Sequence, residues 1–415
     1  MELTRTLRCA TAVTLSTLIV TTGAAQSQLS SAGHGAIDAY LREAVERSDV
    51  PGLVALITGA EGELYRGAFG LQDVARELPM ADDAIFNIAS MTKPITSVAV
   101  MMLVEEGRLA LDDRIAEHLP GVVPTEVFAS FDPATRQFTS RPAATPVTIR
   151  QLLSNTSGLG YPFSNETLFA LIGTTVPSPS VTRFPLLFDP GTRWAYGEST
   201  RVLGSMIEAV TGQGLYEFYR TRVFGPLGMS DTAWIVPEAK LGRVVTRHLT
   251  EAGAFVEISN PTSGELGGAP RGDGGLYSTA SDYAKFLRML LAGGLGPDGT
   301  RLLSADSIAL MGENQIGDLR VELQPAANAE RTRPFPLNAG RDMFGLGFQV
   351  TAAHEDPELR SPGSMSWAGI QNTQFWVDPA RGIGAVLLMQ YLPFYDETAL
   401  AVLEGFERRV YRYME

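Results

Sequence analysis

The sequence predicts an α+β fold in which both ends of the chain build one β-sheet and a mostly helical segment lies between them. Two apolar, strand-like runs near the N-terminus, 53–58 and 64–69, flank a turn-rich segment typical of a hairpin. Three further strand-like runs lie near the C-terminus, at 345–350, 374–377 and 384–389. Helical patterns dominate between the two sets of strands, and this segregation is typical of an α+β protein.

Apolar residues at intervals of three and four positions predict the helices. The predicted helices are residues 36–48, a helix that starts near Ser90 and stops at Gly107, a short helix capped by Thr148, residues 199–224 with a break at 212–214, a helix capped by Thr279 or Ser281 that ends at Leu291, and residues 399–413. Three segments rich in Pro, Gly, Ser, Thr, Ala or Asn are expected to be long loops, namely 119–147, 157–192 and 314–341. Because long loops in compact proteins often bind ligands, the last two are expected to shape a pocket.

The composition limits the function. The 415 residues are 45% hydrophobic and 19% charged, which is typical of a globular protein with one large domain or two. The net charge of −13 and the lack of Lys/Arg runs argue against binding to nucleic acid or anionic membranes. The four histidines, at positions 34, 118, 248 and 354, are widely spread, so no metal cluster is predicted.

Residues 1–25 have the features of a secretory signal peptide. Arg5 and Arg8 precede a weakly apolar run, and Gly23-Ala24-Ala25 offers small residues for cleavage. The run is too short and too rich in threonine for a good membrane span, so we expect export to a periplasmic or secreted location and no span in the mature protein. An uncleaved anchor and a frayed cytosolic terminus are the alternatives. Cleavage would remove Cys9, the only cysteine, and the loss of two Arg and one Glu would change the net charge from −13 to −14.

Lysine is scarce in this chain, and one lysine stands three residues after a serine. Only Lys93, Lys240 and Lys285 are lysines among the 33 Lys and Arg residues. In the tetrad Ser90-Met91-Thr92-Lys93, a helix places the serine and lysine on one face, with Cβ atoms roughly 5–6 Å apart. A desolvated lysine, unlike arginine, can lose its proton, and the neutral amine can then take the serine proton. The alternative is a helix-capping Ser90 with a solvated Lys93, because Ser-x-x-Lys often arises by chance.

Other catalytic motifs are absent from the sequence. It contains no Gly-x-Ser-x-Gly, no His-Glu-x-x-His and no P-loop. Residues 294–299 match Gly-x-Gly-x-x-Gly, but they follow a predicted helix rather than a strand, so we interpret them as a turn. Tyr196 lies between Asp189-Pro190-Gly191 and a predicted helix, and it is a candidate second proton carrier, with a packing role as the alternative.

Five segments, in order along the chain, resemble the motifs of class C β-lactamases and the related family VIII carboxylesterases. They are residues 86–94, 149–159, 194–196, 224–229 and 274–280. This resemblance covers the chain from about residue 36 to the C-terminus. It implies the serine β-lactamase/DD-peptidase fold, in which an antiparallel sheet flanked by helices is joined to a mainly helical region, and the site lies between them.

On this basis we expect residues 26–85 and 270–415 to form the sheet domain and residues 86–269 to form the helical domain.

The same resemblance assigns roles to single residues. Ser90 matches the nucleophile, Lys93 the base or its partner, and Tyr196 the tyrosine that relays a proton to the leaving group. A phenol, with an ordinary pKa of about 10, can do so if a protonated Lys93 favours its phenolate. Which of the two is the base stays open. By the same analogy, the backbone N–H groups of Ser90 and Ile370 form the oxyanion hole.

Two departures from the β-lactamase pattern bear on the substrate. Trp367-Ala368-Gly369 stands where β-lactamases have Lys-Thr-Gly, as in family VIII esterases, and an indole suits a neutral ester better than a carboxylate. Glu198 stands where β-lactamases usually have asparagine, and its carboxylate would repel an anionic substrate. Trp367, Gly369 and Glu198 are therefore predicted to contact the substrate. An exposed residue at the start of a helix is the alternative for Glu198.

These observations predict a serine carboxylesterase that hydrolyses small-molecule esters, short-chain or aryl, through an acyl-enzyme. A β-lactamase or a D-amino-acid peptidase of the penicillin-binding type is the alternative, and a non-catalytic cell-wall sensor is a remote one. The chemistry needs no metal or organic cofactor. The sequence predicts no particular oligomeric state.

Overall fold

The computed structural model of the protein describes residues 28–173, 180–259 and 269–415. The predicted signal peptide, residues 1–25, lies outside the described residues, so its cleavage and export stay predictions. Among the described residues, no helix combines the length and the apolar character needed to cross a bilayer.

The main sheet has eight strands in the order β10-β11-β12-β13-β14-β1-β2-β3. Their bounds are β1 Gly52–Gly59, β2 Glu63–Asp73, β3 Leu78–Pro79, β10 Met343–Phe344, β11 Gln349–Val350, β12 Met365–Gly369, β13 Thr373–Asp378 and β14 Ile383–Leu388. All neighbours pair antiparallel, and β1 joins β14 with Val54 opposite Leu388. The two ends of the chain therefore share one antiparallel sheet, as the sequence predicts.

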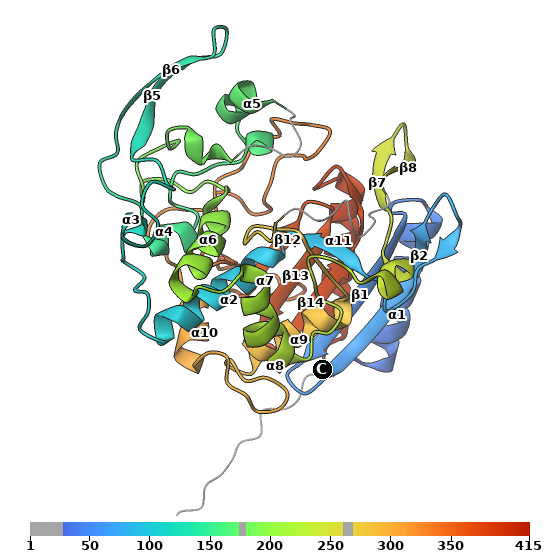
Figure 1. Ribbon diagram of the computed structural model, residues 1–415. Helices are drawn as coiled ribbons and strands as arrows, with labels where there is room; N and C mark the ends of the chain where they lie inside the picture. Colours follow the sequence, from blue (N-terminus) through green and yellow to red (C-terminus); the bar gives the residue numbers. More distant parts are fainter. Residues whose placement is uncertain (1–27, 174–179, 260–268) are drawn as a thin grey trace, which may run out of the picture.

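Helices cover both faces of this sheet (Figure 1). On one face α1 (Ser31–Glu46) packs against α11 (Glu397–Tyr413), and this layer buries Leu53, Ala55 and Ile57 of β1. On the other face α9 (Ala280–Leu291) packs against β1, β13 and β14, and the larger core there contains Val54 and Leu56. Since successive side chains of a strand point to opposite faces, β1 is buried along its whole length.

The region between the two sets of strands is built around α2 (Thr92–Glu105). All residues from 92 to 103 are buried, so α2 is a central helix with no solvated face rather than the one-sided helix that the apolar spacing predicts. The other helical elements are α3 Ile115–His118, α4 Ile149–Leu153, α5 Glu166–Ile172, α6 Ser199–Thr211, α7 Leu215–Tyr219, α8 Gly225–Leu227 and α10 Ala305–Gly312, with the short turns η1 Pro162–Ser164, η2 Val181–Arg183, η3 Arg220–Phe224 and η4 Glu238–Arg243. The α6 helix packs against both α2 and α4.

The loop predicted at 119–147 is wrong in part, because it contains a hairpin of β5 (Glu126–Asp132) and β6 (Gln137–Pro142). The hairpin stands out from the body of the molecule (Figure 1). Nearly all of its residues are at least partly exposed, so the alternation of apolar and polar residues that marks a half-buried strand is missing. Its two strands are held together by cross-strand contacts such as that of Phe128 with Phe138, whose ring centres lie 5.2 Å apart.

Two other predicted loops have different outcomes. Residues 157–192 contain the short helix α5, which the sequence reading missed because Asn165 caps only seven residues. The segment 314–341 has no regular helix or strand, as predicted. A further small sheet joins β15 (Tyr391–Leu392) to β7 (Arg247–Glu251) and β8 (Ala254–Ser259), and β4 (Phe86–Ala89) pairs with β9 (Leu276–Ser278).

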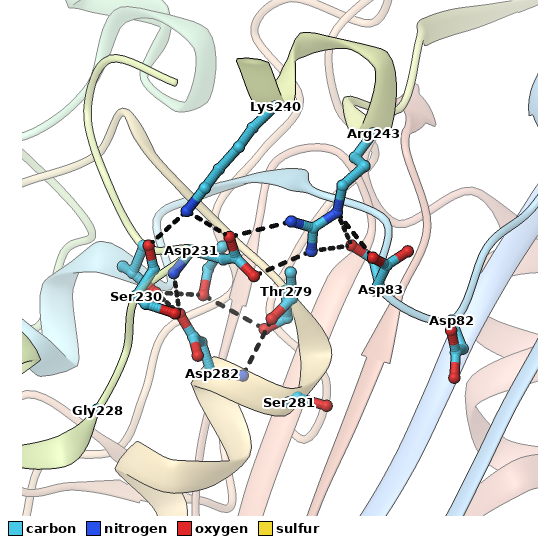
Figure 2. Close-up of polar contacts among 12 residues, drawn as sticks. Asp82, Asp83, Gly228, Ser230, Asp231, Lys240, Arg243, Thr279, Ser281 and Asp282 are labelled. Atoms are coloured by element: carbon cyan, nitrogen blue, oxygen red, sulfur yellow. Dashed lines mark hydrogen bonds and ion pairs between the residues drawn. The ribbon is translucent and has the colours of Figure 1, made fainter. Parts of the chain in front are cut away.

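A surface cluster of charges holds the segment after α8 onto the start of the strand that leads to Ser90. Figure 2 shows Asp231 between Lys240, at 2.7 Å, and Arg243, at 2.9 Å. Arg243 also reaches Asp83, just before β4, and the backbone N–H of Asp231 donates to Asp282 of α9. This Asp231 cluster ties the ends of three segments together on the outside of the fold.

Candidate active site

Ser90 lies at the junction between β4 and α2. The preceding Ala89 has a φ of 45°, in the left-handed region that non-glycine residues rarely adopt. Its backbone N–H donates to the Asn87 side chain at 3.0 Å, and its carbonyl accepts from Thr92 Oγ1 at 2.7 Å. This sharp turn leaves Ser90 half-buried at the wall of a cleft. Strained backbone of this kind gathers at functional sites.

Lys93 points at Ser90 from the first turn of α2. Its Nζ donates to Ser90 Oγ at 3.1 Å and to the Asp273 carbonyl at 2.7 Å. Only 3% of Lys93 is exposed, so the alternative of a solvated lysine does not hold. The residue at the N-cap of α2 is Met91, so Ser90 is not a helix cap either.

Tyr196 completes the predicted group of three. The Lys93 Nζ lies 4.7 Å from the centre of the Tyr196 ring and 5.2 Å from that of Tyr161. The side chains of Ser90 and Trp367 also interact with the Tyr196 phenol and act to lower its pKa. A hydroxyl, an amine and a phenol that are far apart in sequence therefore meet at one place.

The surroundings of Lys93 favour its neutral form. Burial is the largest cause and lowers its pKa to about 7, from an ordinary 10.5. The carboxylate of Asp273 opposes this effect, whereas the positive charges of Arg201 and Arg271 add to it. Close to neutral pH, a large fraction of Lys93 can therefore accept a proton.

The opposite holds for the two tyrosines. Burial raises the pKa of Tyr196, and its interactions with the side chains of Ser90 and Trp367 only partly offset this. Burial also raises the pKa of Tyr161 well above its ordinary value, and the nearby Asp273 carboxylate adds to the effect. Both phenols consequently hold their protons at neutral pH, and of the three groups only Lys93 is a ready proton acceptor.

Asp273 organises the far side of Lys93. Its carboxylate accepts from the Tyr161 hydroxyl at 2.7 Å and from Arg201 at 3.2 Å. Burial acts to raise its pKa, but the positive charges of Arg201, Lys93 and Arg271 outweigh burial and keep the pKa below its ordinary value. The charged carboxylate thus holds Arg201 and Tyr161 beside the amine.

Glu198 is buried, with 1% of its surface exposed, so the alternative of an exposed residue at the start of a helix is wrong. One carboxylate oxygen lies 2.8 Å from Arg201 Nη1. The other accepts from the Ser180 hydroxyl at 2.7 Å and from the Val181 backbone N–H at 3.1 Å. Although Glu198 lines the cleft, these contacts with its own chain occupy both oxygens. Its predicted contact with substrate stays a prediction.

The segment predicted to replace Lys-Thr-Gly is strand β12 and its end. Trp367 is buried, and its ring lies 5.0 Å from that of Tyr196. A Cβ atom on Gly369 would collide with the Ile88 carbonyl and with Thr373 Oγ1, so only glycine allows β12 to lie this close to β4. This contact brings the next residue, Ile370, into the wall of the cleft that contains Ser90. The oxyanion role of the two backbone N–H groups stays a prediction.

Ser90, Tyr161, Tyr196, Asp273 and Trp367 border one cleft with a volume of about 1020 Å³, whereas Lys93 lies behind Ser90 and is not part of its lining. Aromatic residues such as Phe163 and Phe335 form much of its wall, and Phe335 packs at 5.5 Å against Tyr196. Such a cleft is large enough for a drug-sized molecule. Among the described residues, no group of three or more His, Cys, Asp or Glu side chains is placed to hold a metal ion.

The β-lactamase family model matches residues 37–404, which is most of the sequence. The chain belongs to the β-lactamase family. An uncharacterised protein of Mycobacterium tuberculosis (strain CDC 1551 / Oshkosh) is 31% identical over 384 residues, covering 88% of this chain and 92% of that protein. Lovastatin esterase of Penicillium rubens is 28% identical over 400 residues, covering 91% of this chain and 98% of that protein.

A solved structure extends the comparison to the fold. Unliganded simvastatin synthase (LovD) from Aspergillus terreus matches with a TM-score of 0.79 at 25% identity, covering 92% of this chain and 98% of that one. This match confirms the predicted β-lactamase/DD-peptidase fold. Together with the esterase relative, it supports a serine hydrolase of the β-lactamase fold.

In this β-lactamase-family site, sequence reasoning missed the residues that surround Lys93. Tyr161 lies two residues after a matched motif, and Asp273 lies directly before another, in the glycine-rich turn. Arg201 is one turn into a predicted helix, three residues after Glu198, a spacing that favours an ion pair. The spacing could have indicated the Glu198–Arg201 pair, but nothing in the sequence shows that both meet Asp273.

Proposed function

We propose that the protein is a carboxylesterase that hydrolyses esters through an acyl-enzyme on Ser90. The observation that carries this proposal is the contact between the Lys93 amine and the Ser90 hydroxyl in a buried setting where the pKa of Lys93 is about 7. A neutral amine at hydrogen-bonding distance is the arrangement that activates a serine for attack.

In the first step Ser90 Oγ attacks the ester carbonyl and its proton passes to Lys93 Nζ. The negative charge that develops on the carbonyl oxygen is stabilised by the backbone N–H groups of Ser90 and Ile370. Removing one donor of such an oxyanion hole typically slows an enzyme about 10²–10³-fold.

Collapse of the tetrahedral intermediate breaks the bond to the alcohol, which needs a proton as it leaves. The Tyr196 phenol, which keeps its proton at neutral pH and lies against both Ser90 and Lys93, supplies it and is reprotonated from Lys93. We therefore assign the base to Lys93 and the proton relay to Tyr196. Water then attacks the acyl-Ser90 ester with the same groups in reversed order, which releases the acid and restores the enzyme.

The substrate class follows from the wall opposite the nucleophile. Trp367 places an indole, not an ammonium group, beside Tyr196, and aromatic rings line much of the cleft. The name of the Penicillium rubens relative, a lovastatin esterase, points to the same reaction class. Short-chain and aryl esters are the proposed substrates.

The test uses purified protein with p-nitrophenyl acetate and butyrate, compared with Ser90→Ala. We expect turnover by the wild type and loss of nearly all of it in the variant, together with an acyl adduct on Ser90 in the mass spectrum of quenched wild-type protein. Undiminished turnover in Ser90→Ala would remove Ser90 from the mechanism. A clear preference for nitrocefin or a D-Ala-D-Ala peptide would assign the site to a β-lactamase or peptidase instead.

A further inference from the structure

Arg331, from the long loop 314–341, brings a positive charge into the cleft that no described side chain compensates. It lines the cleft, its Nε is buried, and this atom has no hydrogen-bond partner. Among the described residues, no carboxylate oxygen lies within 4.0 Å of its guanidinium nitrogens. Two other cleft arginines differ, since Arg201 pairs with Glu198 at 2.8 Å and Arg360 pairs with Glu407 at 2.7 Å.

A second cation, Arg247, acts on Arg331. Burial lowers the pKa of Arg331, and the positive charge of Arg247 lowers it further. Burial also lowers the pKa of Arg247, which lines the same cleft. A guanidinium that loses solvation and lies near another cation is stabilised by an anion, so the cleft can bind an anion beside Arg331.

Backbone contacts show why these groups converge. The Phe394 N–H donates to the Arg331 carbonyl at 2.9 Å, and the Tyr391 N–H donates to the Gln371 carbonyl at 3.3 Å. Strand β15 also pairs with β7, with Tyr391 opposite His248, the residue after Arg247. The short segment 391–394 therefore holds three pieces of chain against the cleft.

Gln371 gives a second, independent sign of an open polar site. Only 3% of it is exposed, its Oε1 has no hydrogen-bond partner, and it lines the cleft. Buried side-chain amides are nearly always hydrogen-bonded in native proteins. Gln371 directly follows Ile370, so this acceptor oxygen belongs to the residue next to the proposed oxyanion hole.

We propose that Arg331 binds a carboxylate carried by the ester substrate, and that Gln371 Oε1 accepts a hydrogen bond from water or from a donor group of the same substrate. This inference rests on the proposed esterase function and narrows its substrate class to esters with an anionic end. A guanidinium binds a carboxylate with charge-assisted, often paired hydrogen bonds. The anion would thus be recognised from the 314–341 loop rather than from the strand where Trp367 replaces lysine.

The experiment compares two charged esters with their uncharged methyl esters. Mono-p-nitrophenyl glutarate has its carboxylate on the acyl side, and p-butanoyloxybenzoate has it on the alcohol side. In purified protein, Arg331→Met is expected to lower the ratio of kcat/KM for charged to uncharged ester by about tenfold to a hundredfold in at least one pair, the usual loss for a hydrogen bond to a charged group. Arg331→Lys should restore part of the ratio.

Arg333→Met is the matched control, because Arg333 is exposed, does not line the cleft, and its guanidinium donates to the Ala329 carbonyl. It should leave the ratio as it is in the wild type. An Arg331→Met ratio within about twofold of wild type for both pairs would overturn this inference while leaving the esterase proposal intact. Absence of Ser90-dependent turnover with every ester would overturn both.

Discussion

The chain places the same side chain, a lysine amine, in two opposite settings. Lys93 is buried against the Ser90 hydroxyl, a backbone carbonyl and the faces of two tyrosines, with no carboxylate oxygen in direct contact. Lys240, in the Asp231 cluster, is about one-third exposed and lies 2.7 Å from the Asp231 carboxylate, with Ser230 as a further partner (Figure 2). The partners of Lys240 thus include a negatively charged group, whereas those of Lys93 are uncharged.

The difference shows that a buried lysine can act as a base when no carboxylate oxygen pairs with its amine. Asp273 lies beside Lys93 but gives it a backbone carbonyl, while its carboxylate is taken by Tyr161 and Arg201. In the Asp231 cluster, by contrast, the carboxylate of Asp231 contacts the amine of Lys240 directly. The ion pair at the surface connects segments of the chain, whereas the lack of a paired carboxylate in the cleft leaves Lys93 able to accept a proton.

The largest expected effect is the loss of Lys93. Lys93→Met fills a similar volume but removes the only ready proton acceptor, so kcat/KM for p-nitrophenyl butyrate should fall about 10²–10⁴-fold, the usual contribution of a general base. Steady-state kinetics with the purified variant measure this. Activity within tenfold of the wild type would show that another group takes the serine proton.

Lys240→Met is the matched control on the other side of the comparison. Breaking a partly exposed ion pair should cost less than about 1 kcal/mol of unfolding free energy, measured by urea denaturation, with little change in kcat/KM. A loss of activity in Lys240→Met as large as that in Lys93→Met would contradict the different roles assigned to the two lysines.

Tyr196→Phe is expected to have an effect that depends on the leaving group. An alkoxide is a strong base and needs the phenol's proton to leave, so turnover of an alkyl ester such as ethyl butyrate should fall about 10²–10⁴-fold. Nitrophenolate leaves without a proton, and its ester should lose much less. The two esters are compared by titration of released acid, and equal losses for both would contradict the relay role.

The pH dependence of the wild type should report Lys93. The folded protein lowers the pKa of this amine to about 7, so the neutral, active form disappears as the pH falls below that value. We expect kcat/KM to drop about tenfold for each pH unit below about 7 and to level off above it. An unchanged rate through this range would show that the base is not Lys93 in its neutral form.

Much of this arrangement could be predicted from the sequence, because strong local patterns encode it. The apolar runs around Val54 and Trp376 predicted the shared sheet, and the Ser90-Met91-Thr92-Lys93 spacing predicted the pairing of hydroxyl and amine. The hairpin at 126–142 could not be predicted, since its exposed strands bury too little surface to leave a periodic pattern. Burial of α2 on every side depends on neighbours distant in sequence, so helical spacing alone could not show it.

The residues of the site that could not be predicted also depend on contacts between segments distant in sequence. Tyr161, Arg201 and Asp273 come from three separate segments, and their mutual contacts exist only after folding. Glu198 was expected to be exposed or to meet the substrate because its position beside a helix start gives no sign of burial. The structure buries Glu198 and places both of its oxygens against groups of the fold, which excludes the exposed alternative and leaves the contact with substrate a prediction.

The smallest expected effect tests the electrostatic half of the comparison. Arg271 is largely exposed and lies 3.5 Å from Asp273, and its positive charge is one cause of the low pKa of Lys93. Arg271→Met removes a cation near the amine and frees the Asp273 carboxylate to act on it, and both changes stabilise protonated Lys93. The pKa of Lys93 should therefore rise, and the inflection of the kcat/KM profile should move to higher pH by roughly a few tenths of a unit, as is reasonable for a solvent-screened charge. Arg333→Met, which removes a charge outside the cleft, should leave the inflection in place. A shift to lower pH in Arg271→Met would show that arginine charge does not help to keep Lys93 neutral, and burial alone would then account for the base.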